Sequence, residues 1–180
     1  MSGEFTNKVV VVTGGSRGIG RSIAQSFARE GAQTVLAASS QANLDKAAQE
    51  IGNSGTKPLT FAGDLKTLEA CEALHAFVQE KLGRCDALIN NAGATRSGNF
   101  LELPDAAFAD GFALKYFAAV RLSRLFWPML KETEGRVVNI IGGAARSDGQ
   151  GRAHQSRASA RLHQHQGRGA DRRQTVRQSR

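Results

Sequence analysis

Short apolar runs alternate with helix-periodic stretches along most of the chain. Residues Lys8–Thr13 include four consecutive valines, a continuous run typical of a strand covered on both faces. Apolar side chains then recur at helical spacing, at Ile19, Ile23, Phe27 and Ala28, until Gly31 ends the pattern. The alternation continues and predicts strands at Gln33–Ala38, Pro58–Ala62, Ala87–Asn90 and Arg136–Ile141, with helices at Leu44–Ile51, Leu68–Leu82 and Asp105–Leu130. Because strands that alternate with helices indicate βαβ units, the sequence predicts a doubly wound α/β domain with a parallel sheet.

A glycine-rich segment joins the first predicted strand to the first predicted helix. Its sequence is Thr13-Gly14-Gly15-Ser16-Arg17-Gly18-Ile19-Gly20. The glycines at 14, 18 and 20 let the backbone turn sharply and approach a ligand without an intervening Cβ. The unpaired N–H groups at the start of the helix lie at the positive end of its dipole, which favours a pyrophosphate. The alternative is a tight turn whose glycines serve packing alone, and their position between a strand and a helix favours the phosphate loop.

At these residues the chain resembles the short-chain dehydrogenase/reductase family, whose cofactor loop has the spacing TGxxxGxG. The resemblance covers residues 7–143 and includes Gly63-Asp64-Leu65 after the third strand, Asn90-Asn91-Ala92-Gly93 after the fourth, and Gly135–Ile140 at the fifth. It implies a Rossmann-like sheet with strand order 3-2-1-4-5 and oxidoreduction of a carbonyl or alcohol with NAD(P). It also implies that Asp64 lies against the adenine and that Asn90 to Gly93 line the cofactor cleft. Taken alone, Asp64 is equally well explained as a residue at a helix N-terminus.

The end of the second strand bears on the choice of cofactor. It reads Leu36-Ala37-Ala38-Ser39-Ser40, without the acidic residue that binds an adenosine ribose and repels a 2′-phosphate. Arg17 can pair with a 2′-phosphate, and Ser39 or Ser40 can donate a hydrogen bond to it, unless Arg17 is only a solvated surface charge. We therefore expect NADP(H) rather than NAD(H). The predicted cofactor-binding residues are Thr13, Gly14, Ser16, Arg17, Gly18, Ile19, Gly20, Ser39, Asp64, Leu65, Asn90, Ala92 and Gly93.

The resemblance further implies a catalytic Asn, Ser, Tyr and Lys, the last two spaced as YxxxK. The Asn position falls on Lys115 and the Ser position on Gly142. Tyr116 is the only tyrosine, Val120 follows it four residues later, and no lysine follows Lys131. We therefore assign no catalytic residue. Adjacent helical residues point about 100° apart, so Lys115 and Tyr116 cannot replace the missing pair. We expect Tyr116 to be a helix-packing residue, whereas Lys115 either reaches the cleft or is a surface charge.

The last part of the chain has a different composition. Residues 1–143 contain 15 Lys+Arg and 14 Asp+Glu, whereas residues 144–180 contain 9 Arg, no Lys and 2 acidic residues, giving net charges of +1 and +7. The second segment has no aromatic residue, and its only larger aliphatic residues are Leu162 and Val176, too little apolar surface to offset the entropy of ordering. The sequence thus predicts a cofactor-binding domain at 1–143 and a disordered basic tail at 144–180.

Two explanations of the tail follow from its composition. A shifted reading frame from about Ala145 would account for the abrupt change, and a genuine arm would bind nucleic acid through its arginines. The lack of aromatic residues for base stacking favours the first and makes a nucleic-acid partner the less favoured hypothesis. Its histidines have no Cys or acidic cluster beside them, so no metal site is expected.

Three functional hypotheses remain open: an oxidoreductase, a non-catalytic NADP(H)-binding module, and a nucleic-acid binder. The sheet is expected to be truncated after its fifth strand, which leaves Val137–Ile141 as an aggregation-prone edge. Helix 105–130 is a candidate surface for a homo-oligomer. Two lone cysteines and the lack of a long apolar run favour a soluble, cytoplasmic chain without a membrane partner.

Overall fold

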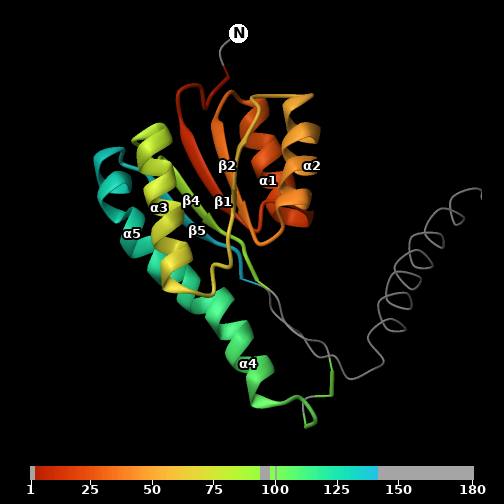
Figure 1. Ribbon diagram of the computed structural model, residues 1–180. Helices are drawn as coiled ribbons and strands as arrows, with labels where there is room; N and C mark the ends of the chain where they lie inside the picture. The colour runs from red at the N-terminus through yellow and green to blue at the C-terminus, as the bar shows by residue number, and fades with distance from the viewer. Residues whose placement is uncertain (1–2, 94–97, 100, 142–180) are drawn as a thin grey trace, which may run out of the picture. The chain divides into compact units, whose positions relative to one another are not determined.

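A single sheet of parallel strands organises the part of the chain that the computed structural model describes, residues 3–93, 98–99 and 101–141. The basic segment 144–180 lies outside these residues. The strands are β1 (Val9–Thr13), β2 (Gln33–Ala38), β3 (Leu59–Ala62), β4 (Ala87–Asn90) and β5 (Arg136–Asn139). Their order is β3-β2-β1-β4-β5, which confirms the predicted topology (Figure 1).

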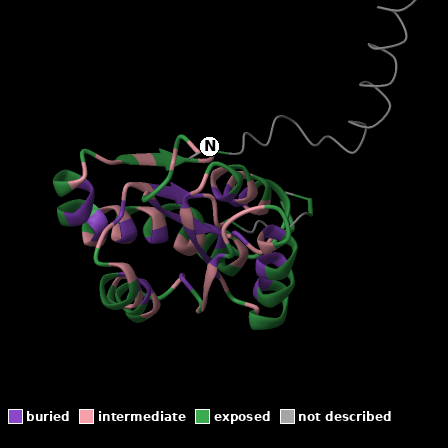
Figure 2. Ribbon diagram, turned by 90° about the horizontal axis from the view of Figure 1, so that it is seen from above, coloured by how far each residue is buried: buried purple, intermediate pink, exposed green. Residues whose placement is uncertain are grey.

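The four valines of β1 supply side chains to both faces of the sheet. Val10 and Val12 join the apolar cluster that includes residues of α1 (Gly18–Arg29) and α2 (Gln41–Gly52). Val11 joins a second cluster, with residues of α3 (Leu68–Leu82) and α5 (Ala118–Glu132). Figure 1 shows these helix pairs on opposite sides of the sheet, and in Figure 2 the buried residues gather between the layers. The unbroken valine run is thus explained by a strand covered on both faces.

The predicted long helix is interrupted. It consists of α4 (Asp105–Phe112), a π-helical segment η1 (Ala113–Phe117) and α5. The N–H of Ala118 donates to the carbonyl of Ala113, five residues earlier. The prediction of one continuous helix was therefore wrong at these residues, because apolar periodicity does not reveal a local change from i−4 to i−5 hydrogen bonding.

Two apolar residues do not have the burial that their predicted elements imply. Ile19, assigned to the apolar face of the first helix, is 63% exposed at the start of α1. Ile141, assigned to the fifth strand, is 84% exposed and follows β5, which ends at Asn139. Within the described part of the chain β5 pairs only with β4, so it forms an edge of the sheet.

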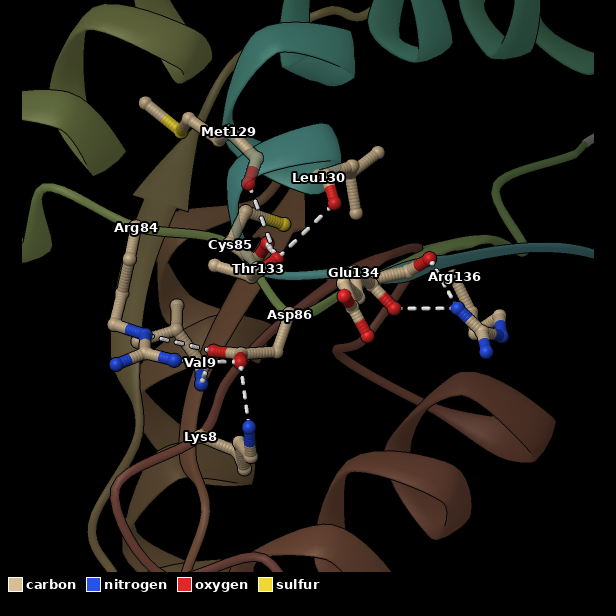
Figure 3. A network of polar contacts seen from close by, with 11 residues as sticks. Lys8, Val9, Arg84, Cys85, Asp86, Met129, Leu130, Thr133, Glu134 and Arg136 are labelled. Carbon is tan, nitrogen blue, oxygen red and sulfur yellow. Dashed lines mark hydrogen bonds and ion pairs between the residues drawn. The ribbon is translucent and has the colours of Figure 1, made fainter.

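Asp86, whose side chain is only 9% exposed, lies where the amino ends of β1, β4 and β5 meet (Figure 3). Its Oδ2 accepts hydrogen bonds from the N–H of Val9 at 2.9 Å and from Nε of Arg84 at 2.9 Å. Its Oδ1 accepts from Nη2 of Arg84 at 2.7 Å and from Nζ of Lys8 at 3.1 Å. The main chain continues the junction, because the N–H of Arg136 donates to the carbonyl of Asp86 at 3.0 Å. Burial by itself raises the pKa of Asp86, but these donors outweigh it and hold the pKa below its usual range.

No helix in the described ranges is long and apolar enough to cross a membrane. The same residues contain no cluster of three or more His, Cys, Asp or Glu side chains that could hold a metal ion.

Both cysteines are expected to resist thiol reagents in the folded protein. Cys71 and Cys85 are free thiols with no exposed surface. Burial raises the pKa of Cys71 above its usual range and raises the pKa of Cys85 to about 12, so little thiolate forms at neutral pH. Iodoacetamide at pH 8, followed by mass spectrometry, should label neither thiol in buffer and both in concentrated urea. Rapid labelling of Cys85 in buffer would contradict its burial.

Candidate functional site

The glycine-rich loop leaves β1 at the carboxyl edge of the sheet. β1 pairs with β2 on one side and β4 on the other, so the strand order reverses beside it, and crevices at such points bind ligands in α/β folds. Gly14 and Gly18 have φ values of +65° and +55°, in the left-handed region that favours glycine. A Cβ added at Gly18 would meet no atom within 4 Å. The start of α1 therefore presents open main chain to a ligand.

Thr13 and Asn91 join the glycine loop to the loop that follows β4. Oγ1 of Thr13 accepts hydrogen bonds from the N–H groups of Asn91 at 3.0 Å and Ala92 at 2.9 Å. Nδ2 of Asn91 donates to the carbonyl oxygens of Thr13 at 3.0 Å and Gly14 at 3.3 Å. Because Thr13 is only 2% exposed, these bonds are shielded from water and hold the two loops together.

Asn91 also explains why two of the loop glycines lack room for a side chain. A Cβ at Gly14 would lie 2.9 Å from Nδ2 of Asn91, and a Cβ at Gly20 would overlap both that nitrogen and the carbonyl oxygen of Gly14. The cofactor-binding residues predicted from the sequence include Asn90, Ala92 and Gly93 but not Asn91, although the range predicted to line the cleft contains it. The position of Asn91 in the motif could have indicated a role in this loop. The direction of its side chain could not be read from the sequence.

Arg17, in the glycine loop, and the two serines at the end of β2 are the groups predicted to favour NADP(H) over NAD(H). Arg17 is exposed at the N-cap of α1, and no described residue pairs with its guanidinium. Ser39 is exposed, whereas the hydroxyl of Ser40 accepts a hydrogen bond from the N–H of Asn43 and so caps α2. Of the two serines, Ser39 is therefore the one without a structural role in the described residues.

Asp64 and Leu65 follow β3 and have different surroundings. Asp64 is exposed and precedes the N-cap of α3, Thr67, by three residues, so it lies outside the first turn of the helix. Its Oδ1 accepts from the N–H of Lys66 at 3.2 Å, and Nζ of Lys66 lies 3.5 Å from its Oδ2. Nζ of Lys66 also pairs with Asp110 of α4 at 3.4 Å, and these two carboxylates raise the pKa of Lys66. Leu65 is 2% exposed within the apolar core, which leaves only its main chain for a ligand.

Asn90 is the buried end of a small polar cluster. Its Nδ2 donates to Oδ1 of Asn139 at 2.9 Å and to Oγ of Ser123 at 3.2 Å. Its Oδ1 is buried and has no hydrogen-bond partner among the described residues. Asn90 thus fixes the ends of β4 and β5 against α5, and sequence reasoning missed Ser123 and Asn139 because they are distant in the chain.

The π-helical segment sets the directions of Lys115 and Tyr116. A Cβ at Gly93 would lie 2.7 Å from Cδ and 3.0 Å from Nζ of Lys115, so this side chain extends over the loop that follows β4. That placement supports the first of its two sequence interpretations, in which Lys115 reaches the cleft. Tyr116 is 56% exposed, and its ring lies edge-on against the ring of Phe117 in the same helical segment, with the two centroids 5.3 Å apart.

These features define a Rossmann-type fold with a glycine-rich loop at its switch point. The sequence profile of the short chain dehydrogenases matches residues 8–158. The chain therefore belongs to the short-chain dehydrogenase family, which confirms the resemblance inferred from the motifs. The match ends beyond residue 143, where the composition placed the domain boundary.

Relatives agree with this assignment. Oxidoreductase UcpA of Salmonella typhimurium is 34% identical over 137 residues, which are 76% of this chain and 52% of the relative. An uncharacterized oxidoreductase of Mycobacterium tuberculosis is 33% identical over 161 residues, 88% of this chain and 61% of the relative. The chain spans about half the length of the first of these curated relatives.

Solved structures resemble the fold in the same way. L-Sorbose reductase from Gluconobacter frateurii, in complex with NADPH and L-sorbose, has a TM-score of 0.70 and 35% identity, covering 76% of this chain and 53% of that one. A metagenomic short-chain oxidoreductase in complex with NADP has a TM-score of 0.73 and 31% identity, covering 90% of this chain and 79% of that one.

Proposed function

We propose that residues 1–143 bind NADP(H), and that the protein acts in the oxidoreduction of a carbonyl or alcohol. The observation that carries the proposal is the pair of loops joined by Thr13 and Asn91 at the switch point, with open main chain at Gly18. The NADPH and NADP complexes of the similar structures support the same cofactor class.

Separate groups of residues would contact separate parts of the cofactor. The loop from Thr13 to Gly20 would receive the pyrophosphate, with Ser16 and Ile19 beside it, because its N–H groups lie at the positive end of α1. Arg17 and Ser39 would hold the 2′-phosphate. Asp64 and the main chain of Leu65 would border the adenine, and Asn90, Ala92 and Gly93 would form the cleft wall. When bound, the cofactor supplies or accepts the hydride.

No catalytic residue is assigned. The sequence has neither a serine at 142 nor a YxxxK pair, so NADP(H) binding without turnover is the second candidate function. Incubation with NADPH and a panel of aldehydes and ketones, followed at the NADPH absorbance, separates the two. Turnover above the protein-free rate would favour the enzyme.

Self-association through residues 105–130 stays a prediction, which sedimentation equilibrium tests.

Arg17→Ala is expected to weaken NADPH binding about tenfold or more and to leave NADH binding unchanged, since charge-assisted hydrogen bonds contribute about 1.5–3 kcal/mol. Isothermal titration calorimetry with both cofactors measures the difference. Arg29→Ala, which removes an exposed arginine from the last turn of the same helix, is the matched control. Ser39→Asp should shift the preference toward NADH by repelling the 2′-phosphate. An equal loss for both cofactors on Arg17→Ala would contradict the assignment.

A further inference from the structure

The guanidinium of Arg121, in the first turn of α5, contacts the main chain of the loop between β3 and α3. Its Nη1 donates a hydrogen bond to the carbonyl oxygen of Lys66 at 2.8 Å. The guanidinium also lies over the ring of Phe117, one turn earlier in the chain, with its carbon 5.8 Å from the ring centroid. Because the ring attracts the cation and limits the positions of the side chain, Arg121 is held ready to donate this bond.

The peptide unit that joins Lys66 to Thr67 is held on both sides. Its carbonyl oxygen accepts from Arg121, and its N–H donates to the main-chain oxygen of Asp64 at 3.1 Å. The preceding N–H, of Lys66, donates to Oδ1 of Asp64 at 3.2 Å. The direction of the Asp64 carboxylate therefore depends on a backbone conformation that Arg121 fixes from a separate element.

Other contacts hold the loop at its beginning and middle. The N–H of Gly63 donates to the carbonyl oxygen of Ala38 at 3.0 Å, and the side chain of Leu65 is buried in the core. At the end of the loop, Nζ of Lys66 pairs with two exposed carboxylates, but such pairs contribute little because water screens them. A hydrogen bond from a charged donor to a carbonyl contributes more, so Arg121 provides the main tie at this end.

We infer that Arg121 is a positioning residue for the cofactor, which holds loop 63–66 in the conformation where Asp64 and the main chain of Leu65 border the adenine. The inference rests on the proposed function, which places the adenine at this loop. Arg121 acts through the loop and does not touch the adenine. A loop that is ordered in advance binds its ligand without the cost of ordering it. Loss of the tie lowers the binding-competent fraction of the protein and raises the apparent Kd in proportion.

The alternative is that the bond serves only the packing of α5. The helices α3 and α5 lie side by side on one face of the sheet and share a buried apolar cluster that includes Leu74 and Phe126 (Figure 1). This apolar contact joins the two helices without Arg121. A bond that served packing alone would affect the stability of the protein and leave its affinity for the cofactor unchanged.

Arg121→Gln removes the charge and shortens the side chain. We expect NADPH and adenosine 2′,5′-bisphosphate, which lacks the nicotinamide, each to bind the full chain about fivefold more weakly, the loss typical of one hydrogen bond. Isothermal titration calorimetry measures both affinities. Arg121→Lys, which keeps a charged donor, should restore part of the affinity. Arg29→Gln, at an exposed arginine in the last turn of α1, is the matched control and should change neither affinity.

A double-mutant cycle separates positioning from a general loss of stability. If Arg121 acts through Asp64, Arg121→Gln should weaken NADPH binding much less in a chain that already carries Asp64→Ala, because the group that it positions is absent. The same fivefold loss in both backgrounds would overturn the inference. So would an unchanged NADPH affinity in Arg121→Gln.

Amide hydrogen exchange tests the loop without any cofactor. Peptides that cover residues 63–67 should exchange faster in Arg121→Gln than in the unmodified chain, whereas peptides that cover β1 should not change. Unchanged exchange at 63–67 would overturn the inference even if NADPH binds. If the unmodified chain binds no NADPH while Arg121→Gln still speeds exchange at 63–67, the proposed function fails and the ordering of the loop by Arg121 is supported.

Discussion

Gly20→Val is expected to abolish measurable NADPH binding and to lower the free energy of unfolding by about 1–3 kcal/mol, the usual cost of overpacking. The added Cβ would overlap Nδ2 of Asn91 and the carbonyl oxygen of Gly14. Relief of this overlap requires that the glycine loop and the loop after β4 separate, which breaks the bonds between Thr13 and Asn91. Calorimetric titration with NADPH and urea unfolding measure the two effects.

The control for this change is Gly52→Ala, at the end of α2. A Cβ there would lie 3.3 Å from the flexible side chain of Lys57, so it fits with a small adjustment. We expect a change within about 1 kcal/mol, since alanine is the better helix former by about that amount. NADPH affinity should not change. If Gly20→Val stays folded and binds NADPH normally, the bonds between Thr13 and Asn91 do not hold the glycine loop in its binding geometry.

Asp86→Asn is expected to lower the free energy of unfolding by about 2–4 kcal/mol, because the carboxylate takes charge-assisted hydrogen bonds on both oxygens. The side chain of Asp86 is 9% exposed, whereas those of Lys8 and Arg84 are 44% and 41% exposed, so the buried partner sets the cost. An amide at this position keeps only one acceptor oxygen. Its NH2 group, which is a donor, would face the donor groups of Lys8 or Arg84. Urea unfolding at pH 7 measures the loss.

The pH dependence of stability provides a second readout of Asp86. Its pKa in the folded protein is below the usual range, so the unfolded chain binds the proton more readily. The stabilisation is therefore fully present above the ordinary Asp pKa of about 3.9 and is lost as the pH falls through the lower folded value. Asp86→Asn should remove this acid-dependent part. Glu80→Gln, which breaks an exposed pair with Lys81, is the control and should leave the free energy of unfolding nearly unchanged, because solvent screens that pair. A similar loss in both variants would contradict the role given to Asp86.

Local signals located most elements of the fold. Gln33–Ala38, Leu68–Leu82 and Ala87–Asn90 have the bounds that the sequence predicts. The α3 helix shows why: Thr67 accepts from the N–H of Ala70 at its start, and Gly83 ends it with φ of +64°. The π-helical turn at Ala113–Phe117 had no comparable signal, since its residues are ordinary helix formers and aromatics.

The candidate site was predictable to the extent that its residues are consecutive. The glycine loop and the Asn-Asn-Ala-Gly motif are contiguous, and main-chain geometry dominates their role. Arrangements that join distant segments were not predictable, such as Asn91 with Thr13, or Asn90 with Ser123 and Asn139. Their partners are separated by tens of residues, and only the parallel pairing of β1, β4 and β5 brings them together.

The sequence by itself determined the parallel α/β fold, the glycine loop and the family, because apolar periodicity and local backbone demands are written in neighbouring residues. The tertiary structure alone decided that Asn91 braces the glycine loop, that Lys115 lies over Gly93, and that Arg121 reaches the carbonyl of Lys66. These depend on the directions of side chains from separate elements, which are fixed only when the helices pack on the sheet and one π-helical turn changes their phase.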